Sequence, residues 1–142
     1  MGNRVEAKIK LINDKIKFSC KAEDYPEIIT DYIPPLGNNE GYMPLQLFLI
    51  SLAACTSGTV LPLLRAMKKT VSGYEMKIEG LRREEHPTRF SRIIMDIEIR
   101  SNDLEPDDLG KALKLAEEKY CPVWAMIKDN VTVETKYKII KS

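Results

Sequence analysis

The chain has 142 residues, with 22 Lys and Arg against 21 Asp and Glu, so its formal net charge is only +1. This length predicts one domain, covering residues 1–142. The balanced charge argues against a nucleic-acid binder, because contacts with phosphates need a surplus of positive charge on one face. Three cysteines without a CxxC pair, and an N-terminus without an apolar core, predict a cytoplasmic protein with free thiols rather than a secreted one.

Alternation of apolar and charged residues predicts strands in both halves of the chain. The first two strands flank an Asn13-Asp14 turn, which is typical of a hairpin. The third ends at Pro34-Pro35, and the other three lie in the second half. The predicted strands are residues 5–11, 16–20, 28–33, 74–79, 93–99 and 131–139.

Helical spacing of apolar residues predicts a helix over residues 106–120, with Pro106 in its first turn and acidic residues at its positive end. Pro122 favours the first turn of a further short helix over residues 122–127. A long helix occupies the middle of the chain. The predicted order is therefore strands, long helix, strands, helix and strand, which is an α+β domain.

The long helix is predicted from about Pro44 to Lys69, and residues 41–64 carry no formal charge. About 20 apolar residues can span a membrane, but polar residues and prolines interrupt this segment, so we expect no membrane. The helix would be roughly 39 Å long, whereas a compact chain of this size is about 37 Å across. One sheet covers only one side of such a helix. We therefore expect a second copy of the chain to cover the other side in an obligate, intertwined homodimer.

The three cysteines differ in their surroundings. Cys20 lies on the apolar face of the second strand, where a packing role is the simplest interpretation. Cys55 lies among small and hydroxyl side chains of the long helix, which either allow close helix packing or leave room for a reagent. Cys121 precedes Pro122, and it would either cap the short helix, where free amides favour a thiolate, or occupy an ordinary helix corner. Spacing alone does not predict that Cys55 and Cys121 meet.

Other kinds of chemistry have less support in the sequence. His86, the single histidine, lies in a segment of mixed charge that is typical of a solvated loop. The sequence contains no phosphate-binding loop, no paired catalytic carboxylates and no cluster of metal ligands. It therefore predicts neither a metal nor an organic cofactor.

Three segments together are similar to those of a known family. They are Pro44 with the helix that reaches Leu52-Ala53-Ala54-Cys55-Thr56, then Arg82-Arg83-Glu84-Glu85-His86-Pro87 with Arg89-Phe90, and Ala116-Glu117-Glu118-Lys119-Tyr120-Cys121-Pro122-Val123. Over about residues 5–140 the chain resembles the OsmC/Ohr family of osmotically inducible and organic hydroperoxide resistance proteins. This resemblance implies an intertwined homodimer in which two sheets wrap round two central helices.

The resemblance also implies a chemistry. It is that of a thiol peroxidase that reduces organic hydroperoxides or hydrogen peroxide in antioxidant defence, without metal or organic cofactor. By position, Cys55 matches the peroxidatic cysteine and Cys121 the resolving cysteine. Cys55 would form a sulfenic acid, Cys121 would convert it to a disulfide, and an external dithiol would reduce that disulfide.

The sequence departs from the family pattern at the pair that activates the thiolate. The resemblance implies a Glu in the first turn after the helix-opening proline, but Leu45-Gln46-Leu47 follows Pro44. It also implies an early Arg, for which Arg4 is a poor match. The alternatives for a positive charge are Arg82, Arg83 and Arg89, and the loss of such a charge shifts a pKa by about 1–3 units. The chain is most similar to a subgroup that lacks the pair and keeps both cysteines.

Two functions are therefore weighed. The first is a hydroperoxide reductase that uses Cys55 and Cys121. The second is a non-catalytic dimeric binding protein that holds a small lipophilic ligand in the seam between its subunits. The missing Glu and Arg favour the second, whereas the retention of both cysteines in their motifs favours the first.

Overall fold

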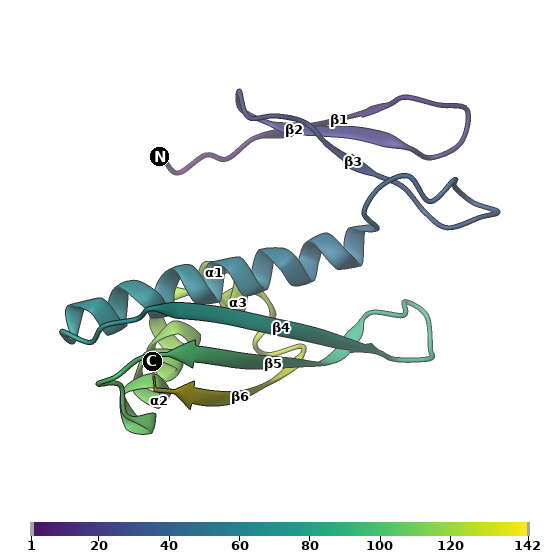
Figure 1. Ribbon diagram of the computed structural model, residues 1–142. Coiled ribbons are helices and arrows are strands. Elements are labelled where there is room, and N and C mark those ends of the chain that lie inside the picture. Colours follow the sequence, from purple (N-terminus) through teal and green to yellow (C-terminus); the bar gives the residue numbers. More distant parts are fainter. Residues whose placement is uncertain (1, 142) are drawn as a thin grey trace. The chain divides into compact units, whose positions relative to one another are not determined.

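The computed structural model describes residues 2–141. It confirms the predicted α+β class, with two three-stranded sheets and a long helix between them in chain order (Figure 1). The elements are β1 (Ala7–Leu11), β2 (Phe18–Ala22), β3 (Ile28–Thr30), α1 (Pro44–Ala66), β4 (Gly73–Arg82), β5 (Phe90–Arg100), α2 (Pro106–Leu115), the π-helix η1 (Ala116–Tyr120), α3 (Pro122–Ile127) and β6 (Thr132–Ile140).

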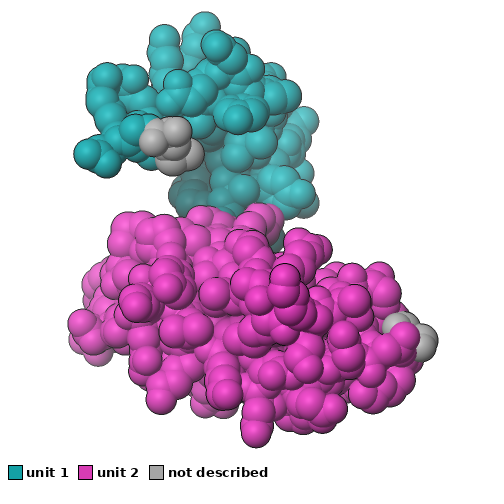
Figure 2. Space-filling view, turned by 90° about the vertical axis from the view of Figure 1, so that its left-hand side faces the viewer, with its two compact units in different colours: residues 1–48 teal, residues 49–142 magenta. Residues whose placement is uncertain are grey.

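The chain divides into two compact units (Figure 2). The N-terminal unit ends at Phe48 and contains the first sheet and the first turn of α1. The C-terminal unit begins at Leu49 and contains the rest of α1, the second sheet and the other helices. A single domain over residues 1–142 remains a prediction, as does the homodimer.

The first sheet has the order β1–β2–β3 and is antiparallel throughout. Ile9, Cys20 and Ile28 are neighbours across its three strands, so they share one face. β2 begins two residues later than predicted. The reason is the turn, where the Asn13 side-chain oxygen accepts the backbone N–H groups of Lys15 and Lys17 and delays strand pairing to residue 18.

A buried carboxylate organises the loop after β3. Asp31 is fully buried, and its oxygens accept the backbone N–H groups of Tyr32, Asn38 and Glu40 at 2.8–3.2 Å. Burial by itself raises the pKa of Asp31, but the three amides outweigh it and hold that pKa below its usual 3.8. Gly37 completes the loop, because a Cβ there would lie 2.3 Å from a carboxylate oxygen of Asp31.

The second sheet has the order β4–β5–β6 and buries one face. On β5 the fully buried side chains are at alternate positions, namely Ile93, Met95, Ile97 and Ile99. β4 pairs with β5 antiparallel, whereas β6 runs parallel to β5. A parallel neighbour requires a crossover connection, which here consists of α2, η1 and α3.

Helices cover the buried face of this sheet. Residues four apart on α1 are fully buried, as amphipathic packing requires: Leu52, Thr56, Val60 and Leu64. α1 ends at Ala66, three residues before the predicted end, because Lys68 adopts a left-handed conformation (φ 65°) and the Lys69 amide bonds back to the Leu64 carbonyl. In residues 2–141, α1 is the one helix that is long and apolar enough to span a membrane by composition, a test that core helices also pass.

The helix predicted over residues 106–120 is corrected by the structure. It is α-helical only as far as Leu115, and Ala116–Tyr120 forms a π-helix that closes when the Cys121 amide bonds to the Ala116 carbonyl. The apolar spacing is compatible with both helix types, so it does not reveal the change. The consequence is local, because the wider turn ends immediately before Cys121.

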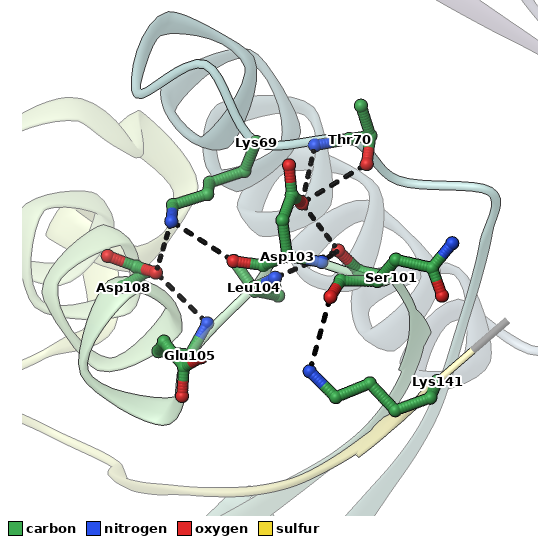
Figure 3. A network of polar contacts seen from close by, with 9 residues as sticks. Lys69, Thr70, Ser101, Asp103, Leu104, Glu105, Asp108 and Lys141 are labelled. Carbon is green, nitrogen blue, oxygen red and sulfur yellow. Dashed lines mark hydrogen bonds and ion pairs between the residues drawn. The ribbon is translucent and has the colours of Figure 1, made fainter.

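A polar network fixes the end of α1 to the start of α2 (Figure 3). One Asp103 oxygen accepts hydrogen bonds from the Thr70 amide, the Thr70 hydroxyl and the Ser101 hydroxyl at 3.0–3.1 Å. Lys69 bonds to the Asp103 carbonyl at 3.0 Å and pairs with Asp108 at 3.4 Å. The network therefore connects α1, which carries Cys55, to the start of α2, from which the chain continues through η1 to Cys121.

Candidate functional site

The C-terminal unit brings two of the three cysteines together. Cys55 lies in the middle of α1 and is half-buried, whereas Cys121 lies between η1 and α3 and is 2% exposed. Their sulfur atoms are 3.1 Å apart, with the Cys121 thiol directed at the Cys55 sulfur. Both are free thiols. The pair that spacing alone did not predict is thus in contact.

The end of η1 and Pro122 set the position of Cys121. Cys121 has an extended backbone conformation and caps α3, which is the first of the two alternatives that the sequence left open. Its sulfur accepts the backbone N–H of Trp124 at 3.5 Å and lies 3.8 Å from the Thr56 hydroxyl. The buried sulfur of Cys121 therefore has polar partners on both α3 and α1.

The Cys55 thiol has a different balance of forces. Burial raises its pKa, and the adjacent Cys121 raises it further through their hydrogen bond and through its charge when ionised. The backbone N–H of Val123, in the first turn of α3, lowers the pKa of Cys55, but burial prevails and the pKa stays above the usual 9.0.

A model of the OsmC-like protein family matches residues 37–136 of this chain. The chain belongs to the OsmC-like protein family. This family is associated with peroxide resistance and redox chemistry. The family resemblance predicted from the sequence is thus confirmed.

Individual relatives agree with this assignment. Protein YhfA of Escherichia coli strain K12 is 28% identical over 97 residues, which are 68% of this chain and 72% of that protein. A hypothetical protein from Aquifex aeolicus VF5 is 26% identical, with a TM-score of 0.86 over 99% of both chains. An organic hydroperoxide resistance protein OsmC from Legionella pneumophila shares the fold, with a TM-score of 0.73 at 18% identity over 95% of this chain and 96% of that one.

The positions that depart from the OsmC-like pattern have other partners in this chain. Gln46 accepts the backbone N–H of Met43 through its side-chain oxygen at 2.9 Å, and so closes the first turn of α1. Arg4 is exposed and pairs with Glu6 at 3.0 Å in the N-terminal unit.

The three later arginines hold backbone instead. Arg82 bonds to the Thr88 carbonyl at 2.6 Å, and Arg83 to the Pro87 carbonyl at 2.7 Å, so both close the β4–β5 loop. Arg89 donates to the Asn130 carbonyl at 3.0 Å and ties this loop to the segment before β6. Within residues 2–141, none of them is among the groups that shift the pKa of Cys55. His86 is exposed in the same loop, as predicted.

The sequence offered free amides of the short helix as one alternative for Cys121, and the Trp124 amide does bond to its sulfur. It did not indicate that the Val123 amide acts on Cys55 or that the Thr56 hydroxyl contacts Cys121. The short helix after Pro122 was the available signal for the amides, because the first N–H groups of a helix have no partner within it. The described residues contain no cluster of three or more His, Cys, Asp or Glu side chains that could hold a metal ion.

Proposed function

We propose that this OsmC-like protein is a thiol-dependent peroxidase that reduces organic hydroperoxides or hydrogen peroxide. The observation that carries the proposal is the distance of 3.1 Å between the Cys55 and Cys121 sulfurs, in a chain whose family is associated with peroxide resistance. Cys55 is the more exposed of the two, so it meets the peroxide. Cys121 is buried behind it and resolves the product.

The chemistry balances with two thiols and one peroxide. The Cys55 thiolate attacks one peroxide oxygen and breaks the O–O bond; the Cys55 sulfenic acid forms, and the leaving alkoxide takes a proton to become the alcohol. The Cys121 thiolate then attacks the Cys55 sulfur, an S–S bond forms, and hydroxide leaves and is protonated to water. An external dithiol returns the disulfide to two thiols by exchange.

A backbone donor supports the Cys55 thiolate in place of a cation. The Val123 amide lowers the pKa of Cys55, whereas the hydrogen bond with Cys121, at a sulfur–sulfur distance of 3.1 Å, raises it. Burial also raises the pKa of Cys55, so thiolate is scarce at neutral pH. The rate of Cys55 oxidation is therefore expected to keep rising above pH 9.0, the usual pKa of a thiol.

We also propose that the protein works as a homodimer. Residues four apart on α1 are exposed in the single chain although none is charged: Ile50, Ala54, Gly58 and Pro62. Such an apolar helix face is expected to be covered. The alternative function is that of a non-catalytic dimeric protein that binds a lipophilic ligand between its subunits. It would use the same surface, and the cysteines would have no catalytic role.

Intact mass after peroxide treatment tests the enzyme. With excess cumene hydroperoxide, the denatured wild-type chain is expected to lose about 2 Da as one disulfide forms. Cys55→Ser and Cys121→Ser should not lose this mass, whereas Cys20→Ser, the matched control, should. An unchanged thiol count in the wild type would refute the peroxidase and favour the binding protein.

A further inference from the structure

Thr56 has an unusual hydrogen-bond partner for a threonine in a helix. It is fully buried on α1, directly after Cys55. A helical threonine commonly bonds to the carbonyl four residues earlier, and Thr59 on the same helix does so, with its hydroxyl 2.9 Å from the Cys55 carbonyl oxygen. The Thr56 hydroxyl instead lies 3.8 Å from the Cys121 sulfur.

The direction of this hydrogen bond is fixed when Cys121 is a thiolate. A thiolate has no proton to donate, so the Cys121 sulfur then accepts the Thr56 O–H. It also accepts the Trp124 amide at 3.5 Å. Every buried side-chain oxygen and nitrogen within residues 2–141 has a hydrogen-bond partner. For the Thr56 hydroxyl, this partner is the Cys121 sulfur. A buried hydroxyl is therefore committed to Cys121.

We infer that Thr56 is a positioning residue for the resolving step, an inference that rests on the proposed peroxidase. Its hydroxyl and the Trp124 amide stabilise negative charge on Cys121 when this thiolate attacks the Cys55 sulfenic acid. In that step the Cys121–Cys55 bond forms, the sulfur–oxygen bond of the sulfenic acid breaks, and the departing hydroxide is protonated to water. Thr56 keeps its own proton throughout.

The two steps of the reaction should respond differently to the loss of this hydroxyl. Charge on Cys121 competes with charge on Cys55, because like charges on two sulfurs 3.1 Å apart repel each other. Removing the Thr56 donor therefore leaves oxidation of Cys55 as fast as before or faster, but it slows disulfide closure. A purely structural defect would slow both steps.

Two substitutions separate the hydroxyl from the packing of the side chain. Thr56→Val keeps the shape and removes the donor, whereas Thr56→Ser keeps the donor and removes a methyl group. We expect closure in Thr56→Val to be about tenfold slower, the size expected for one lost hydrogen bond to a charged group. Dimedone should then trap more sulfenic acid on Cys55, and the pH of half-maximal closure should move upward. Thr56→Ser should behave like the wild type.

Other outcomes overturn the inference. Equal closure rates in the wild type and Thr56→Val would remove the role of the hydroxyl, and equally slow closure in both variants would assign the effect to packing. If peroxide produces neither sulfenic acid nor disulfide in the wild type, the peroxidase proposal fails. The rate of disulfide closure is then measured with diamide, which oxidises two thiols to a disulfide while it is reduced to the hydrazine. Slower closure by diamide in Thr56→Val alone supports the inference, and equal rates refute it.

Discussion

The two compact units differ in how much of their apolar surface they bury. In the C-terminal unit, one face of β5 is fully buried, with Ile93 and Ile97 both at 0% exposure. In the N-terminal unit, Ile9 and Leu11 on β1 are 63% and 51% exposed, although they belong to the same kind of alternating strand. Alternation thus shows which side chains share a face, but it does not show whether the same chain covers that face.

This difference bears on where chemistry can be placed. Both thiols of the proposed reaction lie in the unit that has its own core, and a rigid core keeps two sulfurs at a fixed distance. The N-terminal unit has a buried carboxylate that organises a loop, yet it leaves large apolar side chains to solvent. Its stability is therefore expected to depend on a second copy of the chain.

The largest expected effect concerns the exposed face of α1. Ala54→Arg places a charge in the middle of the proposed dimer contact, twice in a symmetric dimer. An unpaired buried charge costs about 3–5 kcal/mol, so the dissociation constant should rise by about a thousandfold or more. Sedimentation equilibrium measures it. Thr132→Arg, at an exposed position of β6, is the control and should leave association unchanged; if Ala54→Arg associates as the wild type does, α1 is not the contact.

The same substitution in each unit sharpens the comparison further. Ile97→Ala removes a fully buried side chain and should lower the free energy of unfolding by about 2–5 kcal/mol at any protein concentration. Ile9→Ala changes an exposed side chain, so its cost should stay below about 0.5 kcal/mol unless a second copy covers it. Urea titrations at several protein concentrations separate the two. A large cost of Ile9→Ala at every concentration would show that the N-terminal unit has a core of its own.

The sequence predicts the elements well, because their signals are local. The start of α3 follows from Pro122, and the strand faces follow from alternation. Hydrogen-bond register is not visible in side-chain spacing, so the change from α2 to the π-helix after Leu115 was missed. The parallel direction of β6 was not predicted either, since alternation is the same for both directions of a strand.

The candidate site depends even more than the fold on contacts that the sequence does not reveal. Motifs marked Cys55 and Cys121, but their contact depends on packing between segments far apart in the chain. Backbone amides such as that of Val123 belong to every sequence, and only the fold directs one at a sulfur. Within residues 2–141, the donors that lie at the sulfurs are amides and a hydroxyl, which no pattern of charged residues in the sequence marks.

Lowering the pH is expected to have a smaller and more local effect, and it tests one carboxylate in each unit. The pKa values of Asp31 and Asp103 both lie below 3.8 in the folded protein, held there against the effect of burial by amide and hydroxyl donors. A lowered folded pKa means that the stabilisation is complete above pH 3.8 and is lost as the pH falls through the folded value. Asp31 accepts three amides, whereas Asp103 accepts the amide of Thr70 and two hydroxyls.

Hydrogen exchange between about pH 5 and pH 2 should therefore show loss of protection at the amides that each carboxylate accepts. The amides to follow are those of Asn38 and Glu40, which bond to the Asp31 carboxylate. Asp31→Asn keeps an acceptor oxygen but does not titrate, so it should flatten the pH dependence of these two amides alone. An unchanged pH dependence in this variant would mean that another group controls the loop.

The smallest effect is expected from the cysteine of the N-terminal unit. Cys20 is half-buried on β2, with its sulfur 3.7 Å from the Thr30 hydroxyl, and serine can keep this polar contact. Cys20→Ser should change the free energy of unfolding by less than about 1 kcal/mol and should leave peroxide consumption as it is in the wild type. Counting free thiols before and after peroxide treatment tests whether Cys20 takes part in the reaction. Peroxide should consume two of the three thiols in the wild type, and both of the two thiols that remain in Cys20→Ser. If the variant fails to close a disulfide, Cys20 takes part in the redox chemistry, and the division between a reactive C-terminal unit and an inert N-terminal one is wrong.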